Sequence, residues 1–132
     1  MRDVLQIDGS QLLLQENVLA ETIKDLLGEM NIDVNAISVE GKLYKLLVYE
    51  EHGHFVKHRD TEKEKGMFGT LLVQLPVEGG YEGGSLVVSH EGEEKEVVFD
   101  KESEKQAYAV AFYADCEHEL KEVKRGYRVA LA

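Results

Sequence analysis

Apolar and polar residues alternate in short runs along most of the chain, and only one segment near the N-terminus has a longer period. In residues 16–30 (ENVLAETIKDLLGEM) the apolar positions recur every three or four residues, the spacing of one helix face. Asn17 suits the N-cap position, because its side chain can accept a hydrogen bond from a free backbone N–H of the first turn. The pattern predicts one amphipathic helix that packs against a sheet.

The rest of the hydrophobic pattern predicts strands. Runs rich in β-branched and aromatic residues are separated by glycine-rich or charged turns. These runs lie near residues 36–40, 43–50, 54–58, 69–75, 85–89, 94–99, 107–113 and 126–131. Many short strands with little helix are typical of a β-sandwich or barrel. We therefore expect a mainly β protein of the α+β type, with residues 1–132 in one domain.

The composition agrees with a folded domain and limits its partners. Hydrophobic residues make up 43% of the 132 positions and charged residues 31%, values typical of globular rather than disordered proteins. Acidic residues outnumber basic ones by 26 to 15, which gives a formal net charge of −11. This excess disfavours nucleic-acid binding, because that binding depends on Lys and Arg to neutralise phosphates.

Cysteine usage and targeting signals favour the reducing interior of a cell. The single cysteine, Cys116, cannot form an intrachain disulfide, so nothing points to secretion. Residues 1–10 do not read as a signal peptide, and no apolar run approaches the roughly 18 residues that span a bilayer. We expect a soluble cytoplasmic protein without a membrane partner.

The segment YEEHGHFVKHRD, residues 49–60, contains the first candidate metal ligands. In a β-strand, residues two apart point to the same side, so His58 and Asp60 can present an imidazole and a carboxylate to one ion. His118 can supply a third ligand from another strand. Two histidines and one carboxylate, with the opposite face of the metal open, suit non-haem Fe(II) oxygen chemistry.

Other histidines and the cysteine favour structural interpretations. His52 and His54 lie in a charged, glycine-containing segment and are interpreted as solvated loop or strand-edge residues. His90 lies between two apolar runs and is interpreted as a turn residue. Cys116 is interpreted as a small buried apolar residue, because a thiolate ligand would compete with oxygen chemistry.

The order of the motifs along the chain resembles a known family. The set comprises Tyr49, Gly53, Phe55, His58 and Asp60, then the paired glycines of EGGYEGGSLVV, HELKEV around His118 and GYRVAL around Arg128. Over roughly residues 40–132 this order resembles the 2-oxoglutarate and Fe(II)-dependent dioxygenases, specifically the prolyl 4-hydroxylase-like branch. The resemblance implies that His58, Asp60 and His118 bind iron and that Arg128 pairs with the distal carboxylate of 2-oxoglutarate. It also implies the double-stranded β-helix form of a jelly roll.

The chemistry of arginine agrees with the role that the resemblance gives Arg128. Its guanidinium is always charged and offers a planar fork of donors that matches a carboxylate in a two-point contact. If Arg128 is buried in the strand at residues 126–131, it needs a counter-charge, which 2-oxoglutarate would supply. The alternative is a surface arginine in a salt bridge.

The resemblance also proposes further contacts to the co-substrate. Tyr49 matches a family position whose hydroxyl helps to bind 2-oxoglutarate; the alternative is an ordinary aromatic core residue. Thr70, Leu72 and Gln74 alternate along one strand and should share a face, which by resemblance lines the pocket. Some relatives carry a tyrosine near the position of Gln74 that hydrogen-bonds the same carboxylate, so here an amide would make that contact.

The function implied by the resemblance is hydroxylation with Fe(II), 2-oxoglutarate and O₂, releasing succinate and CO₂. We expect a prolyl residue of a peptide or protein as substrate, with another amino-acid side chain or a small molecule as alternatives, because fold and cofactor do not fix the substrate. The charged run TEKEKG at residues 61–66 is either a solvated turn or a substrate lid. Relatives carry more sequence after the last strand, so the chain is either a minimal version or a piece of a longer protein.

Two other classes of function stay open. One is a metal-binding jelly roll, such as a cupin-like enzyme, that does not use 2-oxoglutarate. The other is a catalytically silent binding module that keeps the β-sandwich. A complete ligand set argues against the silent module, and an arginine deep in the barrel argues against the first class.

Overall fold

The computed structural model describes residues 2–8, 25, 26, 28–30, 43–60 and 65–132, and these residues contain ten strands. Their bounds are β1 (Arg2–Asp8), β2 (Lys45–His58), β3 (Gly69–Leu75), β4 (Tyr81–Gly83), β5 (Leu86–His90), β6 (Glu93–Val97), β7 (Tyr108–Tyr113), β8 (Glu117–Leu120), β9 (Val123–Gly126) and β10 (Arg128–Leu131). Eight of the strands form one large sheet, in the order β6-β5-β8-β2-β10-β3-β7 with β1 also paired to β2, and β4 pairs with β9 in a separate two-stranded sheet.

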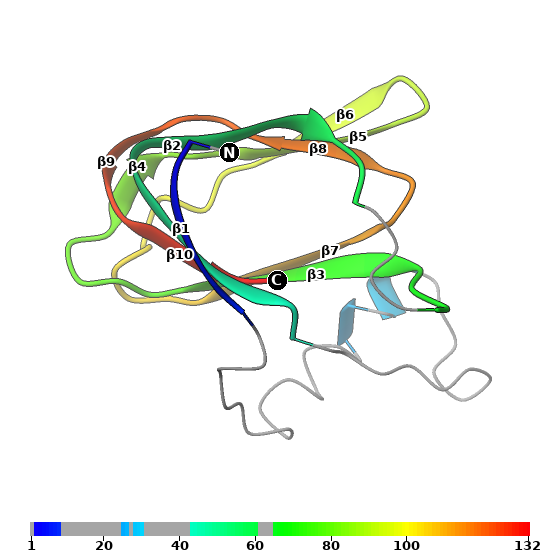
Figure 1. Cartoon of the computed structure of the whole chain (residues 1–132), viewed down its shortest axis with the longest axis horizontal. Coiled ribbons are helices and arrows are strands. Elements are labelled where there is room, and N and C mark those ends of the chain that lie inside the picture. Colours follow the sequence, from blue (N-terminus) through cyan, green and yellow to red (C-terminus); the bar gives the residue numbers. More distant parts are fainter. Residues whose placement is uncertain (1, 9–24, 27, 31–42, 61–64) are drawn as a thin grey trace.

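The large sheet curls into two facing layers that share β2 (Figure 1). The first part of β2 pairs with β1 and β10, and β10 continues the layer through β3 to β7. The last part of β2 pairs with β8, which continues through β5 to β6. Every pairing is antiparallel, and the curled antiparallel sheet agrees with the expected jelly roll.

A bend and a bulge let β2 belong to both layers. His52 has a φ of 72°, a left-handed conformation that histidine adopts more readily than most residues, and its Nδ1 lies 2.5 Å from Glu122 Oε1. Beyond the bend, Phe55 pairs with Leu120 and His58 pairs with His118, so β2 has one more residue than β8 in this interval. Such a β-bulge re-aims the side chains that follow it. Here it brings His58 opposite His118.

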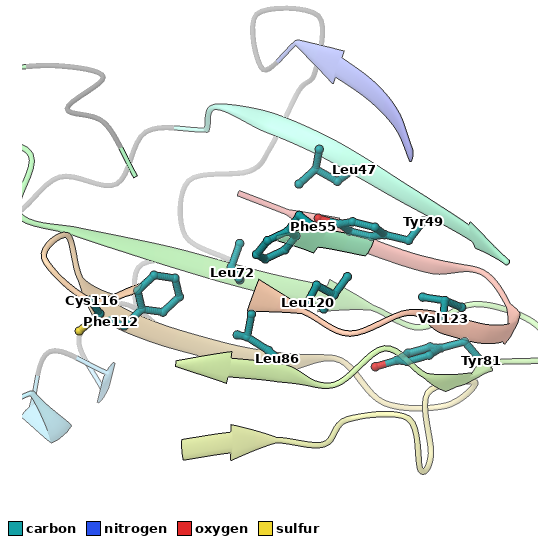
Figure 2. Close-up of a cluster of buried hydrophobic side chains, with 10 residues drawn as sticks. All are labelled: Leu47, Tyr49, Phe55, Leu72, Tyr81, Leu86, Phe112, Cys116, Leu120 and Val123. Atoms are coloured by element: carbon teal, nitrogen blue, oxygen red, sulfur yellow. The ribbon is translucent and has the colours of Figure 1, made fainter. Parts of the chain in front are cut away.

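The apolar core fills the space between the layers (Figure 2). It consists of Leu47, Tyr49, Phe55, Leu72, Tyr81, Leu86, Phe112, Cys116, Leu120 and Val123. Phe112 and Cys116 lie at one end of this cluster, and Tyr81 and Val123 lie at the other. Buried and less buried residues alternate along parts of β2 and β3, so every second side chain there points into the space between the layers.

Gly126 allows β4 to approach β9 closely. Its φ is 78°, and a Cβ at this position would lie 2.1 Å from the carbonyl oxygen of Gly80, which no side chain tolerates. The predicted strand at residues 126–131 is therefore divided: β9 ends at Gly126 and β10 begins at Arg128. The close approach places Tyr81 of β4 opposite Gly126, two residues before Arg128.

The predicted strands agree best where apolar runs are long. The strand at 69–75 has the predicted bounds, and those near 85–89, 94–99 and 107–113 are shifted or shortened by one or two residues. The predicted strands at 43–50 and 54–58 are parts of one strand, and His90 ends β5 rather than lying in a turn. Strands β1, β4 and β9 were not expected.

Other predictions fall largely on residues that the structure does not describe. The strand at 36–40 lies wholly outside the described residues, and only residues 65 and 66 of the charged run 61–66 lie within them. Of the helix at 16–30, residues 25, 26 and 28–30 are described; there the Met30 N–H donates to the Leu26 carbonyl at 3.0 Å. The helix therefore stays a prediction. The described residues include no helix long and apolar enough to cross a membrane.

Candidate metal and co-substrate site

The structure brings His58, Asp60 and His118 together where β2 and β8 meet. One ligand atom from each residue lies within 4.8 Å of the others. Asp60 Oδ1 is 3.4 Å from His118 Nε2 and 3.7 Å from His58 Nε2. We call these three residues the triad. Asp60 lies beyond the end of β2, so its approach to His58 does not follow from strand alternation alone.

The imidazole of His58 is oriented by the backbone. Its Nδ1 lies 2.7 Å from the Val56 carbonyl oxygen, which can only accept, so Nδ1 carries the proton and donates it. In the neutral ring Nε2 then has a free lone pair directed towards Asp60. A hydrogen bond from the distal nitrogen to a carbonyl is the usual support for a metal-binding histidine.

His118 is held by aromatic packing. Its side chain is buried, and its ring lies 4.7 Å from that of Phe112, 5.4 Å from that of Phe55 and 4.5 Å from that of His58, measured between centroids. Among the described residues, its Nδ1 has no hydrogen-bond partner. Packing thus fixes the ring and leaves Nε2 facing Asp60.

Asp60 is kept ionised by its surroundings. The hydrogen bond with His118 is the main cause that lowers the pKa of Asp60 to about 2; burial opposes this shift, and a hydrogen bond from Thr70 supports it. Thr70 Oγ1 donates to Asp60 Oδ2 at 2.6 Å and leaves Oδ1 to the histidines. The lowered pKa means that ionised Asp60 stabilises the folded protein. This contribution is present above a pH of about 4, the pKa of an unfolded Asp, and is lost as the pH falls towards 2.

Replacing Thr70 by valine should weaken divalent metal binding by about tenfold, the lower range for loss of a group that supports a ligand. Valine keeps the shape but removes the hydrogen bond that orients Asp60 and holds its pKa down. Calorimetric titration with Mn(II) measures the effect. Ser85→Ala is the matched control, because Ser85 donates to Glu96 at 2.6 Å, away from the triad. Unchanged Mn(II) affinity in Thr70→Val would contradict the prediction.

Arg128 is buried between the two layers. It is 3% exposed, pairs with Tyr49 across β2 and β10, and places its guanidinium carbon 5.3 Å from the centre of the Tyr49 ring. Within the described part of the chain its Nε has no partner, and no carboxylate forms an ion pair with it. The alternative of a surface arginine in a salt bridge is therefore wrong. A buried cation without a counter-charge is costly, and a bound anion would offset that cost.

Tyr49 and Gln74 lie in the same interior. Burial is the main cause that raises the pKa of Tyr49 to about 12, and the charge of Arg128 acts in the opposite direction. Gln74 is 2% exposed; its Nε2 donates to the Phe99 carbonyl at 3.0 Å, and its Oε1 accepts from the Tyr81 hydroxyl at 2.7 Å. One amide N–H of Gln74 is thus already used within the protein.

The remaining residues that the sequence suggested for the co-substrate pocket have different surroundings in the structure. Leu72 belongs to the apolar core between the layers. Thr70 donates to Asp60 and so supports the triad, and its predicted place in the co-substrate pocket stays a prediction. Tyr81, which sequence reasoning missed, interacts with both Gln74 and Arg128. The signal was an aromatic residue directly after the first glycine pair of GGYEGG.

The other histidines and the cysteine lie outside the triad. His52 contacts Glu122, His54 Nδ1 is 3.0 Å from the His52 carbonyl oxygen, and His90 Nε2 is 2.9 Å from Asp115 Oδ2. Cys116 is a free, buried residue of the apolar core. Among the described residues, only the triad groups three potential metal ligands closely enough to hold one ion.

Comparison with known proteins agrees with this arrangement. A prolyl-4-hydroxylase from Pseudomonas putida has 18% sequence identity and a TM-score of 0.58, with 97% of this chain and 67% of that chain covered. An oxidoreductase of the 2OG-Fe(II) oxygenase family from Burkholderia pseudomallei has 18% identity and a TM-score of 0.59, with 98% and 66% covered. The chain thus spans about two thirds of the length of each, and at this identity the likeness shows the fold alone.

The sequence itself matches a family model. No curated protein is similar enough to count as a match. Residues 44–132, however, match the model of the 2OG-Fe(II) oxygenase superfamily. This match contains both strands that carry the triad histidines and the strand that carries Arg128. Because it extends over most of the sequence, from the residue before β2 to Ala132, the chain belongs to the 2OG-Fe(II) oxygenase superfamily.

Proposed function

We propose that this chain is an Fe(II)- and 2-oxoglutarate-dependent dioxygenase that hydroxylates a peptide or protein side chain, with a prolyl residue favoured, and releases succinate and CO₂. The observation that carries the proposal is the burial of Arg128 without a carboxylate partner in the described residues, in a domain that also groups the three triad residues. Such a cation needs an anion, and a dicarboxylate that also reaches a metal would supply one.

The triad has the donor set that suits the metal. His58, Asp60 and His118 would hold Fe(II), since two imidazoles and one carboxylate on one side leave the other side open to reactants. When bound, Fe(II) supplies the redox chemistry that couples oxidation of 2-oxoglutarate by O₂ to oxidation of a substrate C–H bond. The protein keeps Asp60 ionised, directs Nε2 of His58 towards Asp60 and packs Phe55 and Phe112 against His118.

Arg128 would bind the distal carboxylate of 2-oxoglutarate. Its planar fork matches both oxygens, and burial makes each charge-assisted hydrogen bond stronger than in water. The ring of Tyr49 lies beside the guanidinium and limits its positions. A cupin-like enzyme that does not use 2-oxoglutarate would have no need of this buried cation.

The choice of a peptide or protein substrate has less support than the cofactor chemistry. One neighbour in fold is titled a prolyl-4-hydroxylase, at 18% identity. The formal net charge of −11 disfavours a nucleic-acid partner. These observations favour peptide or protein substrates over nucleic acids, and among them we place the prolyl side chain first.

Anaerobic calorimetry with Mn(II)-loaded protein tests the co-substrate, since Mn(II) occupies such sites without turnover. We expect saturable 2-oxoglutarate binding that requires Mn(II). A folded, Mn(II)-loaded protein that does not bind 2-oxoglutarate would move the assignment to a cupin-like metal enzyme or a silent binding module. Succinate release by the Fe(II) enzyme with proline-containing peptides then tests the substrate; binding without peptide-stimulated release would reject only the peptide part.

A further inference from the structure

A chain of buried polar groups lies behind Arg128. Tyr81 on β4, Gln74 on β3 and Arg128 on β10 are 3%, 2% and 3% exposed, respectively. The Tyr81 hydroxyl donates to Gln74 Oε1 at 2.7 Å, and Gln74 Nε2 donates to the Phe99 carbonyl at 3.0 Å. Arg128 lies close enough to the Tyr81 hydroxyl for its charge and donor groups to lower the pKa of that hydroxyl. Side chains from three strands thus lead from the guanidinium to a backbone carbonyl.

The direction of each hydrogen bond in this chain is fixed. The Phe99 carbonyl can only accept, so the amide nitrogen of Gln74 faces it and the amide oxygen faces Tyr81. The Tyr81 hydroxyl therefore gives its one hydrogen to Gln74 and has lone pairs left to accept from Arg128, which can only donate. No member can reverse its role without losing a bond.

Electrostatics keeps the hydroxyl in this state. Burial raises the pKa of Tyr81, and this effect outweighs the charge and hydrogen bond of Arg128, which act in the opposite direction. The hydroxyl is therefore neutral at ordinary pH and available as a donor to Gln74. Tyr81 does not neutralise Arg128, so the guanidinium keeps its positive charge for a bound anion.

We infer that Tyr81 is a positioning residue for Arg128, and that with Gln74 it sets the affinity and the chain-length selectivity of the co-substrate pocket. The inference rests on the proposed function. Tyr81 and Gln74 tie the guanidinium to the backbone at Phe99, while β2 and β8 fix the triad. A dicarboxylate must span these two fixed points. A longer diacid would require Arg128 to move away from the Tyr81 hydroxyl, which can accept a hydrogen bond from the guanidinium, and the loss of that contact opposes the movement.

The test compares 2-oxoglutarate with 2-oxoadipate, which is one methylene longer, by calorimetry on Mn(II)-loaded Tyr81→Phe and wild type. We expect Tyr81→Phe to weaken 2-oxoglutarate binding about tenfold, a change typical of losing one hydrogen bond to a charged group. The preference for 2-oxoglutarate over 2-oxoadipate should fall by at least about threefold, because the guanidinium can then shift. Mn(II) affinity should stay unchanged.

Tyr108→Phe is the matched control. Tyr108 stacks on Phe99 with ring centroids 4.6 Å apart, and its hydroxyl donates to the Lys101 carbonyl at 3.0 Å. The same atom is removed, near the same backbone, without a contact to Arg128. A purely structural role for Tyr81 would weaken both diacids equally and leave the preference as in wild type; that result would overturn the inference.

Gln74→Met gives a second test that does not depend on the folding of Tyr81→Phe. It removes the acceptor that orients the Tyr81 hydroxyl, and we expect weaker 2-oxoglutarate binding and the same loss of preference. The double variant with Tyr81→Phe should bind 2-oxoglutarate about as weakly as either single variant, because both changes break the same chain of hydrogen bonds. Wild-type behaviour of Gln74→Met would overturn the inference. Failure of wild-type protein to bind 2-oxoglutarate would instead reject the proposed function, so the two failures are distinguishable.

Discussion

Replacing Arg128 by methionine should weaken 2-oxoglutarate binding to the Mn(II)-loaded protein by at least about a hundredfold, from the loss of a buried two-point contact between charges. Methionine retains much of the apolar stem and removes the guanidinium, which is 3% exposed and lies beside the Tyr49 ring. Mn(II) affinity should change little, because Arg128 is not part of the triad. Calorimetry with Mn(II) and then with 2-oxoglutarate measures both affinities.

Two further variants make this result specific. Arg128→Lys keeps the charge but loses the planar fork, so we expect an intermediate affinity. Arg125→Met is the matched control: Arg125 is exposed on β9 and pairs with Glu82 at 3.1 Å, so its loss should leave 2-oxoglutarate binding unchanged. Equal binding by wild type and Arg128→Met would remove the main support for a 2-oxoglutarate enzyme.

Replacing Asp60 by asparagine should reduce Mn(II) affinity by more than about a hundredfold, because loss of a ligand exceeds the effect of losing a group that supports one. Asparagine keeps the size and can still accept from Thr70, but it lacks the charge that Asp60 keeps down to a pH of about 2. Mn(II) titration measures the affinity. Succinate release by the Fe(II)-loaded variant should fall to background.

Asp115→Asn is the control for the change at Asp60. Asp115 also lies beside a histidine, with Oδ2 2.9 Å from His90 Nε2, but outside the triad. We expect wild-type Mn(II) affinity from this variant. Strong Mn(II) binding by Asp60→Asn, or an equal loss in Asp115→Asn, would show that the triad is not the metal site.

The sequence predicted which residues form the triad, but it did not predict the backbone geometry that brings them together. His58, Asp60 and His118 were identified as a set, and the structure brings them together. The bulge that turns His58 towards His118 could not be predicted, because it depends on the register between β2 and β8, far apart in sequence. Alternation was the reason for pairing His58 with Asp60, but β2 ends at His58, so Asp60 lies outside the strand.

Tyr81 shows a second limit of sequence reasoning. It lies in a three-residue strand whose partner, β9, is equally hard to recognise from four residues with three charged or glycine positions. The pairing depends on the left-handed conformation of Gly126 and its contact with Gly80, which is a tertiary property. By contrast, the run around Leu72 and Gln74 was predicted with its correct bounds, because consecutive β-formers signal a strand locally.

The shared strand β2 has a consequence for how this protein can change during evolution. Tyr49, opposite Arg128, and His58, opposite His118, lie on one continuous stretch of backbone. The distance between Tyr49 and His58 depends on the length of β2 alone. A loop such as the one between β6 and β7 can therefore gain or lose residues without changing that distance. A single residue inserted between Tyr49 and His58 would rotate one end of β2 relative to the other and turn either side chain outward. Lineages of this protein should therefore vary in loop length but keep the length of this strand.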